Sequence, residues 1–229
     1  MASGNKNKIK EMAAILESFG MDVISKDDAG FGHIDPEEDG ETYEENSLKK
    51  AMEIMEASGL PVIADDSGLE VEYLSGAPGI HSARFAGDDC NYDRNNEKML
   101  MLLDGVPEEK RRAKFVTVIT MVFAGASSEP TVGDSHAIEK TDSVASEATA
   151  SAESDTTVPA VDQRVIVARG ECPGRIITEL RGSEGFGYDP IFIPDGYEET
   201  FAQLGSEVKN KISHRARALN NLKEKLNEI

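Results

Sequence analysis

PVIADDSGLEVEYL, residues 61–74, decides the fold of this 229-residue chain, because strand-like residues lie on both sides of two adjacent acids. Pro61–Ala64 is a short apolar run that predicts a buried strand, and Leu69–Leu74 predicts another strand. Asp65 and Asp66 therefore stand at the end of the first predicted strand.

This acidic pair is the first candidate for chemistry. Side chains alternate between the two faces of a strand, so one of Asp65 and Asp66 can face a ligand while the other braces the loop. Carboxylate oxygens suit Mg²⁺, which commonly binds through one or two carboxylates plus substrate phosphates. The alternative interpretation is an ordinary aspartate turn, with Gly68 at a positive φ.

Strand and helix patterns alternate along the rest of the chain. Three further runs are strand-like: Phe115–Phe123, Arg164–Ala168 and Ile191–Ile193. Four helices are predicted: Ile9 to Phe19 ended by Gly20, one with a capping box of Thr42 and Glu45 and closed by Gly59, one over Asn91–Leu103, and one capped by Ser213. The mixture predicts a single α/β domain over residues 1–229, with at least one antiparallel strand pair.

The charge of the chain excludes whole classes of partner. There are 24 Lys and Arg against 43 Asp and Glu, a formal net charge of −19. A nucleic-acid binder needs a basic face to replace counterions, and anionic lipid attracts Lys and Arg, so we expect neither a nucleic-acid polymer nor a membrane as partner. A small anionic ligand is compatible with this charge where a local basic pocket or a metal ion receives it.

Cysteine use and hydropathy indicate the compartment. Cys90 and Cys172 lie far apart and form no Cys-x-x-Cys pattern, which predicts neither a disulfide framework nor a zinc site. No apolar run reaches the roughly 18 residues of a membrane span, and no signal sequence opens the chain. We therefore expect a cytoplasmic protein.

Residues 126–162 differ from the rest in composition. They hold eight acidic residues, one basic residue and few large apolar side chains. Such a segment cannot offset the entropy of becoming ordered. We predict a low-complexity acidic insertion at the tip of a hairpin formed by the strand-like runs on either side.

The residues Ser3, Gly4, Asn5, Lys6, Asn7 and Lys8 stand directly before the first predicted helix. Small polar residues at a helix start expose backbone N–H groups and the positive end of the helix dipole, which suits a phosphate. The alternative is an ordinary helix cap with solvated lysines. Only Met1 and Ala2 precede this loop, although a phosphate loop of this kind normally follows a strand.

Two further clusters suit the recognition of a base. Glycines flank Phe186 in Gly185–Pro190, which lets backbone approach a ligand while the ring offers a stacking face; the alternative is a tight turn before a buried strand. Lys209, His214 and Arg215 group hydrogen-bond donors near another helix start, where they either read carbonyl oxygens or serve as cap and surface charge.

An acidic cluster precedes the second predicted helix. Glu37, Glu38, Asp39 and Glu41 crowd a turn, and Glu45 follows in the helix start. Most such clusters are solvated surface, but one of these acids can supply a second metal ligand beside the aspartate pair.

Together these motifs resemble those of the inosine triphosphate pyrophosphatase family, the dITP/XTP pyrophosphatases. The matching strings occur in the family's order and cover most of the chain outside 126–162: SGNKNKIKE, ETYEENSLKKA, ADDSGLEVEYLSGAPGIHSARFAG, GFGYDPIFIPDGYEETFAQL and KNKISHRARAL. The resemblance implies a central twisted mixed sheet flanked by helices, in two lobes with the active-site cleft between them. It also implies a homodimer.

The resemblance further implies an activity. Enzymes of this family cut ITP, dITP and XTP between the α and β phosphates, with Mg²⁺, and so cleanse the nucleotide pool. The implied catalytic residues are Asp66, Asp65 and Lys50, and the implied metal ligands are Asp66 and Glu38, with Glu37 and Glu45 as competing candidates for the second position. The implied substrate-binding residues are Ser3 to Lys8, Ser67, Phe186, Gly187, Tyr188, Asp189, Lys209, His214 and Arg215.

Two alternatives belong to other functional classes. A nucleotide-binding sensor on the same fold would bind without turnover, and a phosphatase would release orthophosphate and leave IDP. The intact aspartate pair favours an enzyme, because a pure binder needs no general base.

Overall fold

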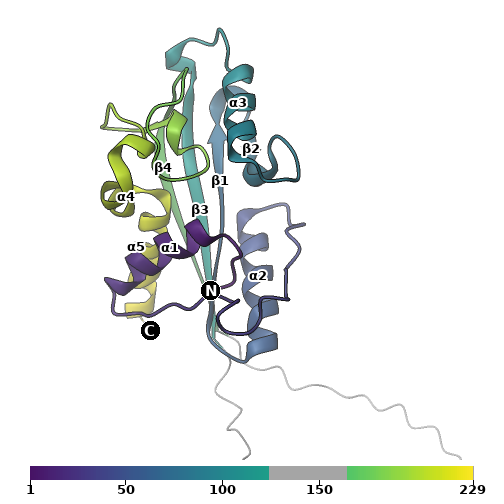
Figure 1. The fold of residues 1–229 in the computed structure, drawn as a ribbon. Coiled ribbons are helices and arrows are strands. Elements are labelled where there is room, and N and C mark those ends of the chain that lie inside the picture. Colours follow the sequence, from purple (N-terminus) through teal and green to yellow (C-terminus); the bar gives the residue numbers. More distant parts are fainter. Residues whose placement is uncertain (124–163, 229) are drawn as a thin grey trace, which may run out of the picture.

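A five-stranded sheet with strand order β2-β1-β3-β4-β5 forms the centre of the protein (Figure 1). The computed structural model describes residues 1–123 and 164–228, and the predicted acidic insertion at 126–162 lies outside them. The strands are β1 (Val62–Val71), β2 (Pro78–Gly79), β3 (Arg112–Phe123), β4 (Arg164–Ile176) and β5 (Phe192–Pro194). The helices are α1 (Lys6–Glu17), α2 (Tyr43–Ser58), α3 (Tyr92–Leu102), α4 (Phe201–Ile212) and α5 (His214–Asn227).

The predicted α/β class is confirmed, but the sheet is not mixed. All four pairings between the described strands are antiparallel. Strand β1 pairs with β3 along its whole length, and β3 pairs with β4 in the same way. Antiparallel neighbours need only a direct chain reversal rather than a crossover helix, which explains why the helices pack on the faces of the sheet without linking parallel strands.

One continuous strand replaces the two that the sequence predicts over residues 61–74. Asp65 pairs with Ile119 and Gly68 with Val116, so the acidic pair lies in the middle of β1 and not at its end. Gly68 is absent from the residues with positive φ, which corrects the turn interpretation. A Cβ at Gly68 would lie 2.1 Å from the carbonyl oxygen of Gly79, so glycine is needed there for the close approach of β2.

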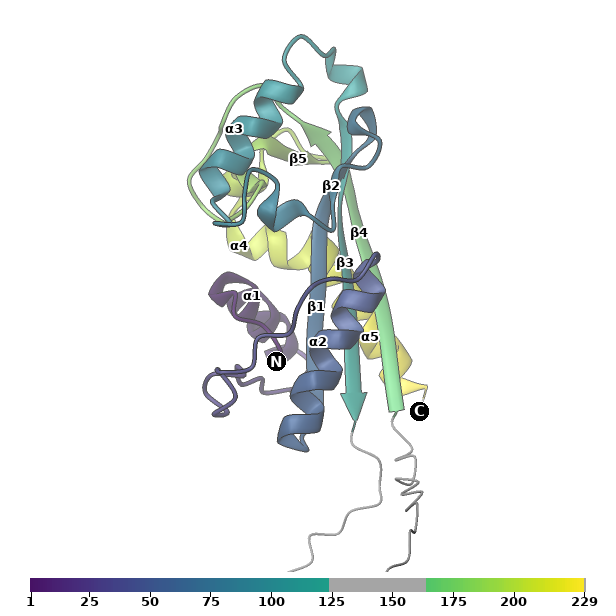
Figure 2. The same cartoon turned by 90° about the vertical axis from the view of Figure 1, so that its right-hand side faces the viewer.

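The sheet joins two lobes, as the resemblance implied. In the lower lobe, α2 covers one face of the sheet and α1 and α5 cover the other (Figures 1 and 2). In the upper lobe, α3, α4 and β5 pack around the far ends of β1, β3 and β4, and Phe115, Phe192 and Phe201 lie in that core. The long strands therefore run through both lobes and fix them relative to each other.

The edge of β1 is only partly covered. Strand β2 pairs with it at Leu69 and Glu70 alone. At the other end the backbone N–H of Ala2 donates to the carbonyl oxygen of Ile63, at 2.9 Å. Met1 and Ala2 thus supply the extended segment that normally precedes a phosphate-binding loop, and a short stretch of the β1 edge between them and β2 has no strand beside it.

Local signals place most of the helices. The capping box of Thr42 and Glu45 is formed, Gly59 ends α2 in the left-handed conformation, and Ser213 caps α5. Helix α4 has no counterpart in the sequence predictions, and Gly205, at φ +75°, interrupts it. None of the helices in the described part of the chain is long and apolar enough to cross a membrane.

Candidate active site

A cavity of about 520 Å³ lies between the lobes, beside the uncovered stretch of the β1 edge. Most of the predicted site residues line it: Ser3, Gly4, Asn5, Lys8, Glu38, Lys50, Asp66, Ser67, Phe186, Gly187, Tyr188, Asp189, Lys209, His214 and Arg215. These residues come from distant parts of the chain, so folding is what brings their side chains together. Lys6, Asn7 and Asp65 are predicted site residues that do not line the cavity.

The N-terminal loop places the start of α1 at the cavity. The Asn5 side-chain oxygen accepts from the backbone N–H groups of Asn7, at 3.0 Å, and Lys8, at 3.3 Å, and so caps the helix. The Ser3 hydroxyl accepts from the Asn5 N–H. The side chains of Lys6 and Asn7 are exposed on the first turn, so of the two lysines only Lys8 reaches the cavity.

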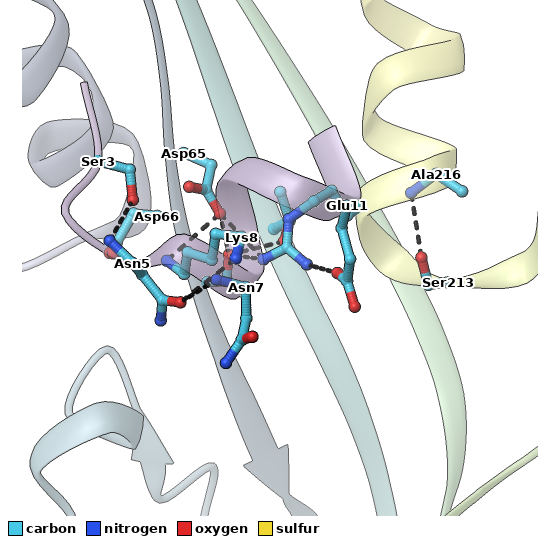
Figure 3. Close-up of polar contacts among 12 residues, drawn as sticks. Ser3, Asn5, Asn7, Lys8, Glu11, Asp65, Asp66, Ser213 and Ala216 are labelled. Carbon is cyan, nitrogen blue, oxygen red and sulfur yellow. Dashed lines mark hydrogen bonds and ion pairs between the residues drawn. The ribbon is translucent and has the colours of Figure 1, made fainter. Parts of the chain in front are cut away.

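Asp65 lies beneath the cavity on the face of β1 that α1 and α5 cover. One carboxylate oxygen receives Lys8 Nζ at 3.3 Å, Arg215 Nη2 at 3.1 Å and the Ser67 hydroxyl at 2.7 Å (Figure 3). Burial raises the pKa of Asp65, but the charges of Lys8 and Arg215 outweigh burial and hold it well below its ordinary value. Asp65 is therefore a fixed anion that holds two cations in place.

Asp66 points to the opposite face, toward α2, and lines the cavity. Its carboxylate lies 3.2 Å from Lys50 Nζ and accepts a long hydrogen bond from Asn46 at 3.4 Å. Burial raises the pKa of Asp66 above its ordinary value, because the opposing charges of Lys50 and Lys8 do not outweigh it and the nearby Glu38 charge also raises it. A buried carboxylate with a raised pKa at a cavity wall is suited to accept a proton.

Glu38 completes this acidic side of the cavity. Its carboxylate receives Lys50 Nζ at 2.8 Å, so Lys50 bridges Glu38 and Asp66. Glu37 is exposed outside the cavity lining, and the Glu45 carboxylate is used in the capping box of α2. Of the three candidates for the second metal ligand, Glu38 is the one that lies beside Asp66.

The donor set fits Mg²⁺ better than a metal held by protein alone. Within residues 1–123 and 164–228, no group of three or more His, Cys, Asp and Glu side chains is arranged to hold a metal. Two carboxylates at one wall of an open cavity match the way Mg²⁺ binds, through one or two carboxylates with substrate phosphates and water completing its shell. Glu38 and Asp66 are the residues that would hold it.

The turn from Gly185 to Asp189 forms the other end of the cavity. The Asp189 carboxylate accepts from the Phe186 N–H at 2.9 Å and receives Lys209 Nζ at 2.5 Å. Lys209 Nζ also lies 4.5 Å from the centre of the Phe186 ring. A Cβ at Gly185 would lie 2.1 Å from Asp189 Oδ2, so this glycine permits the turn that holds Phe186 at the cavity.

His214 and Arg215 project from the start of α5. The His214 ring is buried and stacks on Phe115, with ring centres 4.7 Å apart, and its Nδ1 has no hydrogen-bond partner in the described structure. Burial, followed by the charges of Arg215 and Lys209, lowers the pKa of His214 well below its ordinary value, so the ring is neutral at pH 7. A neutral imidazole with a free ring nitrogen can donate to or accept from a base.

Glu11, Lys26 and Tyr92 are among the residues of the site that escaped the sequence predictions. Glu11, on α1, binds both Lys209 Nζ, at 2.7 Å, and the Arg215 guanidinium. Lys26 is buried at the cavity wall, where its Nζ donates to the carbonyl oxygen of Ile34, and Tyr92 lines the cavity at the start of α3. Glu11 is one helical turn from Lys8, which is the single local signal that the sequence held.

Known proteins resemble this chain along its whole length. The sequence model of the Ham1 family matches residues 1–225. The dITP/XTP pyrophosphatase of Clostridium perfringens is 43% identical, over 100% of this chain and 97% of that protein. The dITP/XTP pyrophosphatase of Haemophilus influenzae is also 43% identical, over 99% of this chain and 97% of that protein. The solved structure of the Staphylococcus aureus Ham1 protein has a TM-score of 0.71 at 35% identity, and covers 99% of this chain and 96% of that one.

Proposed function

Because the chain belongs to the Ham1 family, we propose that it hydrolyses ITP, dITP and XTP between the α and β phosphates, with Mg²⁺, to the nucleoside monophosphate and pyrophosphate. Its predicted class, a nucleoside triphosphate pyrophosphatase, is the class of the relatives named above. One observation supports the chemistry most strongly: the buried Asp66 carboxylate faces the same cavity as a helix N-terminus and several cations.

The triphosphate fits the end of the cavity at the N-terminal loop. Backbone N–H groups at the start of α1, the positive end of its dipole and Lys8 all suit phosphate oxygens. Cleavage of a phosphoanhydride concentrates negative charge on the bridging oxygen, and preformed cations stabilise that charge. Lys50 adds to this positive field from the α2 side of the cavity.

Asp66 is the residue we propose as proton acceptor for the attacking water. Its carboxylate faces the cavity, and Lys50 keeps it oriented at 3.2 Å. Mg²⁺, held by Asp66 and Glu38, would supply charge neutralisation on the phosphates. Asp65 acts through Lys8 and Arg215 and touches no part of the cavity surface.

The base end of the cavity provides a means of selection. The Phe186 ring offers a stacking face, and His214 and Arg215 offer donors to a carbonyl oxygen at the purine 6-position. An adenine amino group cannot accept from these donors, and a buried donor left unpaired is costly, so ATP is rejected.

The same proposal includes a role in cleansing the nucleotide pool, a homodimeric assembly and a cytoplasmic location.

The test is an assay with ITP, with Mg²⁺ or with EDTA, in which IMP, IDP, pyrophosphate and orthophosphate are all measured. We expect IMP and pyrophosphate in equal amounts, only with Mg²⁺. Orthophosphate and IDP would identify a phosphatase instead. Saturable binding of ITP without any product would identify a nucleotide sensor.

A further inference from the structure

Tyr92, at the start of α3, connects the two ends of the cavity. Its hydroxyl accepts a hydrogen bond from Asn5 Nδ2, at 3.0 Å, although the two residues are 87 positions apart. Its ring lies beside the Phe186 ring, with centres 6.0 Å apart and planes at 45°. All three side chains line the cavity. Tyr92 thus touches both the N-terminal loop and the turn at the base end.

The bond to Tyr92 fixes which way the Asn5 amide points. The Asn5 oxygen caps α1 by accepting from two backbone N–H groups, so its amide nitrogen must point away from the helix. That nitrogen is a donor and needs an acceptor, which the Tyr92 hydroxyl supplies. Reversal of the amide would place its NH₂ group against the helix N–H groups and lose the cap together with the bond to Tyr92. Both bonds therefore favour one orientation of Asn5.

The same helix also holds the turn at the base end. Asn96, one turn after Tyr92 on the same face of α3, is buried and donates from Nδ2 to the carbonyl oxygen of Gly187, at 2.9 Å. Helix α3 therefore sets the distance between the phosphate-binding loop and the Phe186 turn. A nucleotide that spans the cavity must match that distance.

We propose that Tyr92 is a positioning residue for the triphosphate-binding loop: its hydroxyl holds Asn5, and with it the start of α1, in the orientation that receives the phosphates. This inference rests on the proposed function for its ligand. Tyr92 acts through Asn5, so its hydroxyl affects the binding of the triphosphate and leaves the proton transfer at Asp66 unchanged.

The first test is Tyr92→Phe, which removes the hydroxyl and keeps the ring. We expect KM for ITP to rise about 2- to 10-fold, the effect of losing one neutral hydrogen bond, with kcat within about 2-fold of wild type. Tyr73→Phe is the matched control, because Tyr73 is exposed and does not line the cavity. A loss of kcat with unchanged KM would overturn the positioning role.

Binding measurements separate this inference from the proposed function. The dissociation constants of a non-hydrolysable α,β-methylene analogue of ITP and of inorganic tripolyphosphate are measured by calorimetry, which requires no turnover. We expect Tyr92→Phe to weaken both probes by the same factor. Weakening of the ITP analogue alone would mean that the hydroxyl serves the nucleoside, and unchanged binding of both would mean that it serves neither; each result overturns the proposal.

A double-mutant cycle with Asn5→Ser tests the mechanism itself. Serine still caps α1 but has no amide to donate to Tyr92. In the Asn5→Ser background, Tyr92→Phe should change KM by less than about 1.5-fold, because the coupled partner is already absent. Independent, multiplicative effects of the two substitutions would contradict the proposed coupling.

Discussion

The two faces of β1 carry the same residue type in adjacent positions and give it opposite properties. On the face covered by α1 and α5, Asp65 contacts Lys8, Arg215 and Ser67 and has a lowered pKa. On the face covered by α2, Asp66 contacts one lysine, lies near another carboxylate and has a raised pKa.

This difference shows how two adjacent residues of one strand can have different roles, one structural and one chemical. Burial raises the pKa of both carboxylates, so burial does not distinguish them. What distinguishes them is the number of cations in contact and the presence of Glu38 on one side only. Asp65 is thereby kept ionised as an anchor for cations, and Asp66 is left able to take up a proton.

The largest expected effect comes from Asp66→Asn. The amide keeps the shape of the side chain but cannot accept a proton from water, so we expect kcat for ITP to fall about 10²- to 10⁴-fold. Pyrophosphate release measures the loss, and circular dichroism checks that the fold is kept. Turnover near the wild-type rate would remove Asp66 from the mechanism.

Asp65→Asn should instead reduce stability. It removes the buried anion that Lys8 and Arg215 share and leaves Arg215 with Glu11 alone, which we expect to lower the free energy of unfolding by about 3 kcal/mol. Urea unfolding measures the change. Asp195→Asn is the control, because its pair with Arg112 is solvent-exposed on both sides and should cost under about 1 kcal/mol. Equal losses in the two variants would contradict the anchoring role.

The pH dependence of unfolding should differ in sign between the two aspartates. A lowered pKa in the folded state means that Asp65 contributes its full stability above its unfolded pKa of about 3.9 and loses it as pH falls through the folded value. The raised pKa of Asp66 means that its ionised form destabilises the fold, so protonation recovers stability as pH falls through that raised value.

Urea unfolding in EDTA from pH 7 to pH 3, compared with each Asp→Asn variant, measures both contributions. The advantage of wild type over Asp65→Asn should shrink as pH falls below about 4. Wild type should gain relative to Asp66→Asn as pH falls. The same direction of change for both variants would mean that the two faces do not differ electrostatically.

His214→Ala should have a smaller effect, on selectivity. Loss of the imidazole removes a donor proposed to read the purine 6-position, so we expect the ratio of kcat/KM for ITP and ATP to fall about 10-fold. Because the pKa of His214 lies well below its ordinary value, the wild-type ratio should stay constant between pH 6.5 and 8. An unchanged ratio in the variant would count against base reading by His214.

The smallest effect is expected at Lys6. Its side chain is exposed and outside the cavity, so Lys6→Ala should change kcat/KM by less than about 2-fold, as for most surface substitutions. Lys8→Ala is the matched comparison, because Lys8 lines the cavity and binds Asp65. Equal losses for the two lysines would mean that the loop binds phosphate in another arrangement.

Local patterns predicted the elements whose signals are local. The capping box at Thr42, the cap at Ser213 and the periodic helices are confirmed because the residues that decide them are close in sequence. The sequence pattern predicted two strands in place of the single strand β1, because Asp65 to Gly68 have low strand propensity. Its pairing with β3, 50 residues away, overrides that propensity.

The motifs predicted which residues form the site, but they did not predict how those residues are arranged. The motifs named most of the cavity lining, but nothing local shows that Asp65 turns away from the cavity or that Glu38 is nearer than Glu37. Glu11 was missed because its partner Arg215 is 204 residues away, and Tyr92 because its bond to Asn5 crosses the cavity. These contacts exist only once the lobes are assembled.

One experiment compares the roles of the two faces of β1 directly. The turnover of ITP by Asp65→Asn and Asp66→Asn is measured with Mg²⁺ at a temperature where both variants are folded. If Asp66 accepts the proton and Asp65 anchors cations, kcat of Asp65→Asn exceeds that of Asp66→Asn by at least about 10²-fold. Equal rates, or a faster Asp66→Asn, would contradict the division of roles between the two aspartates.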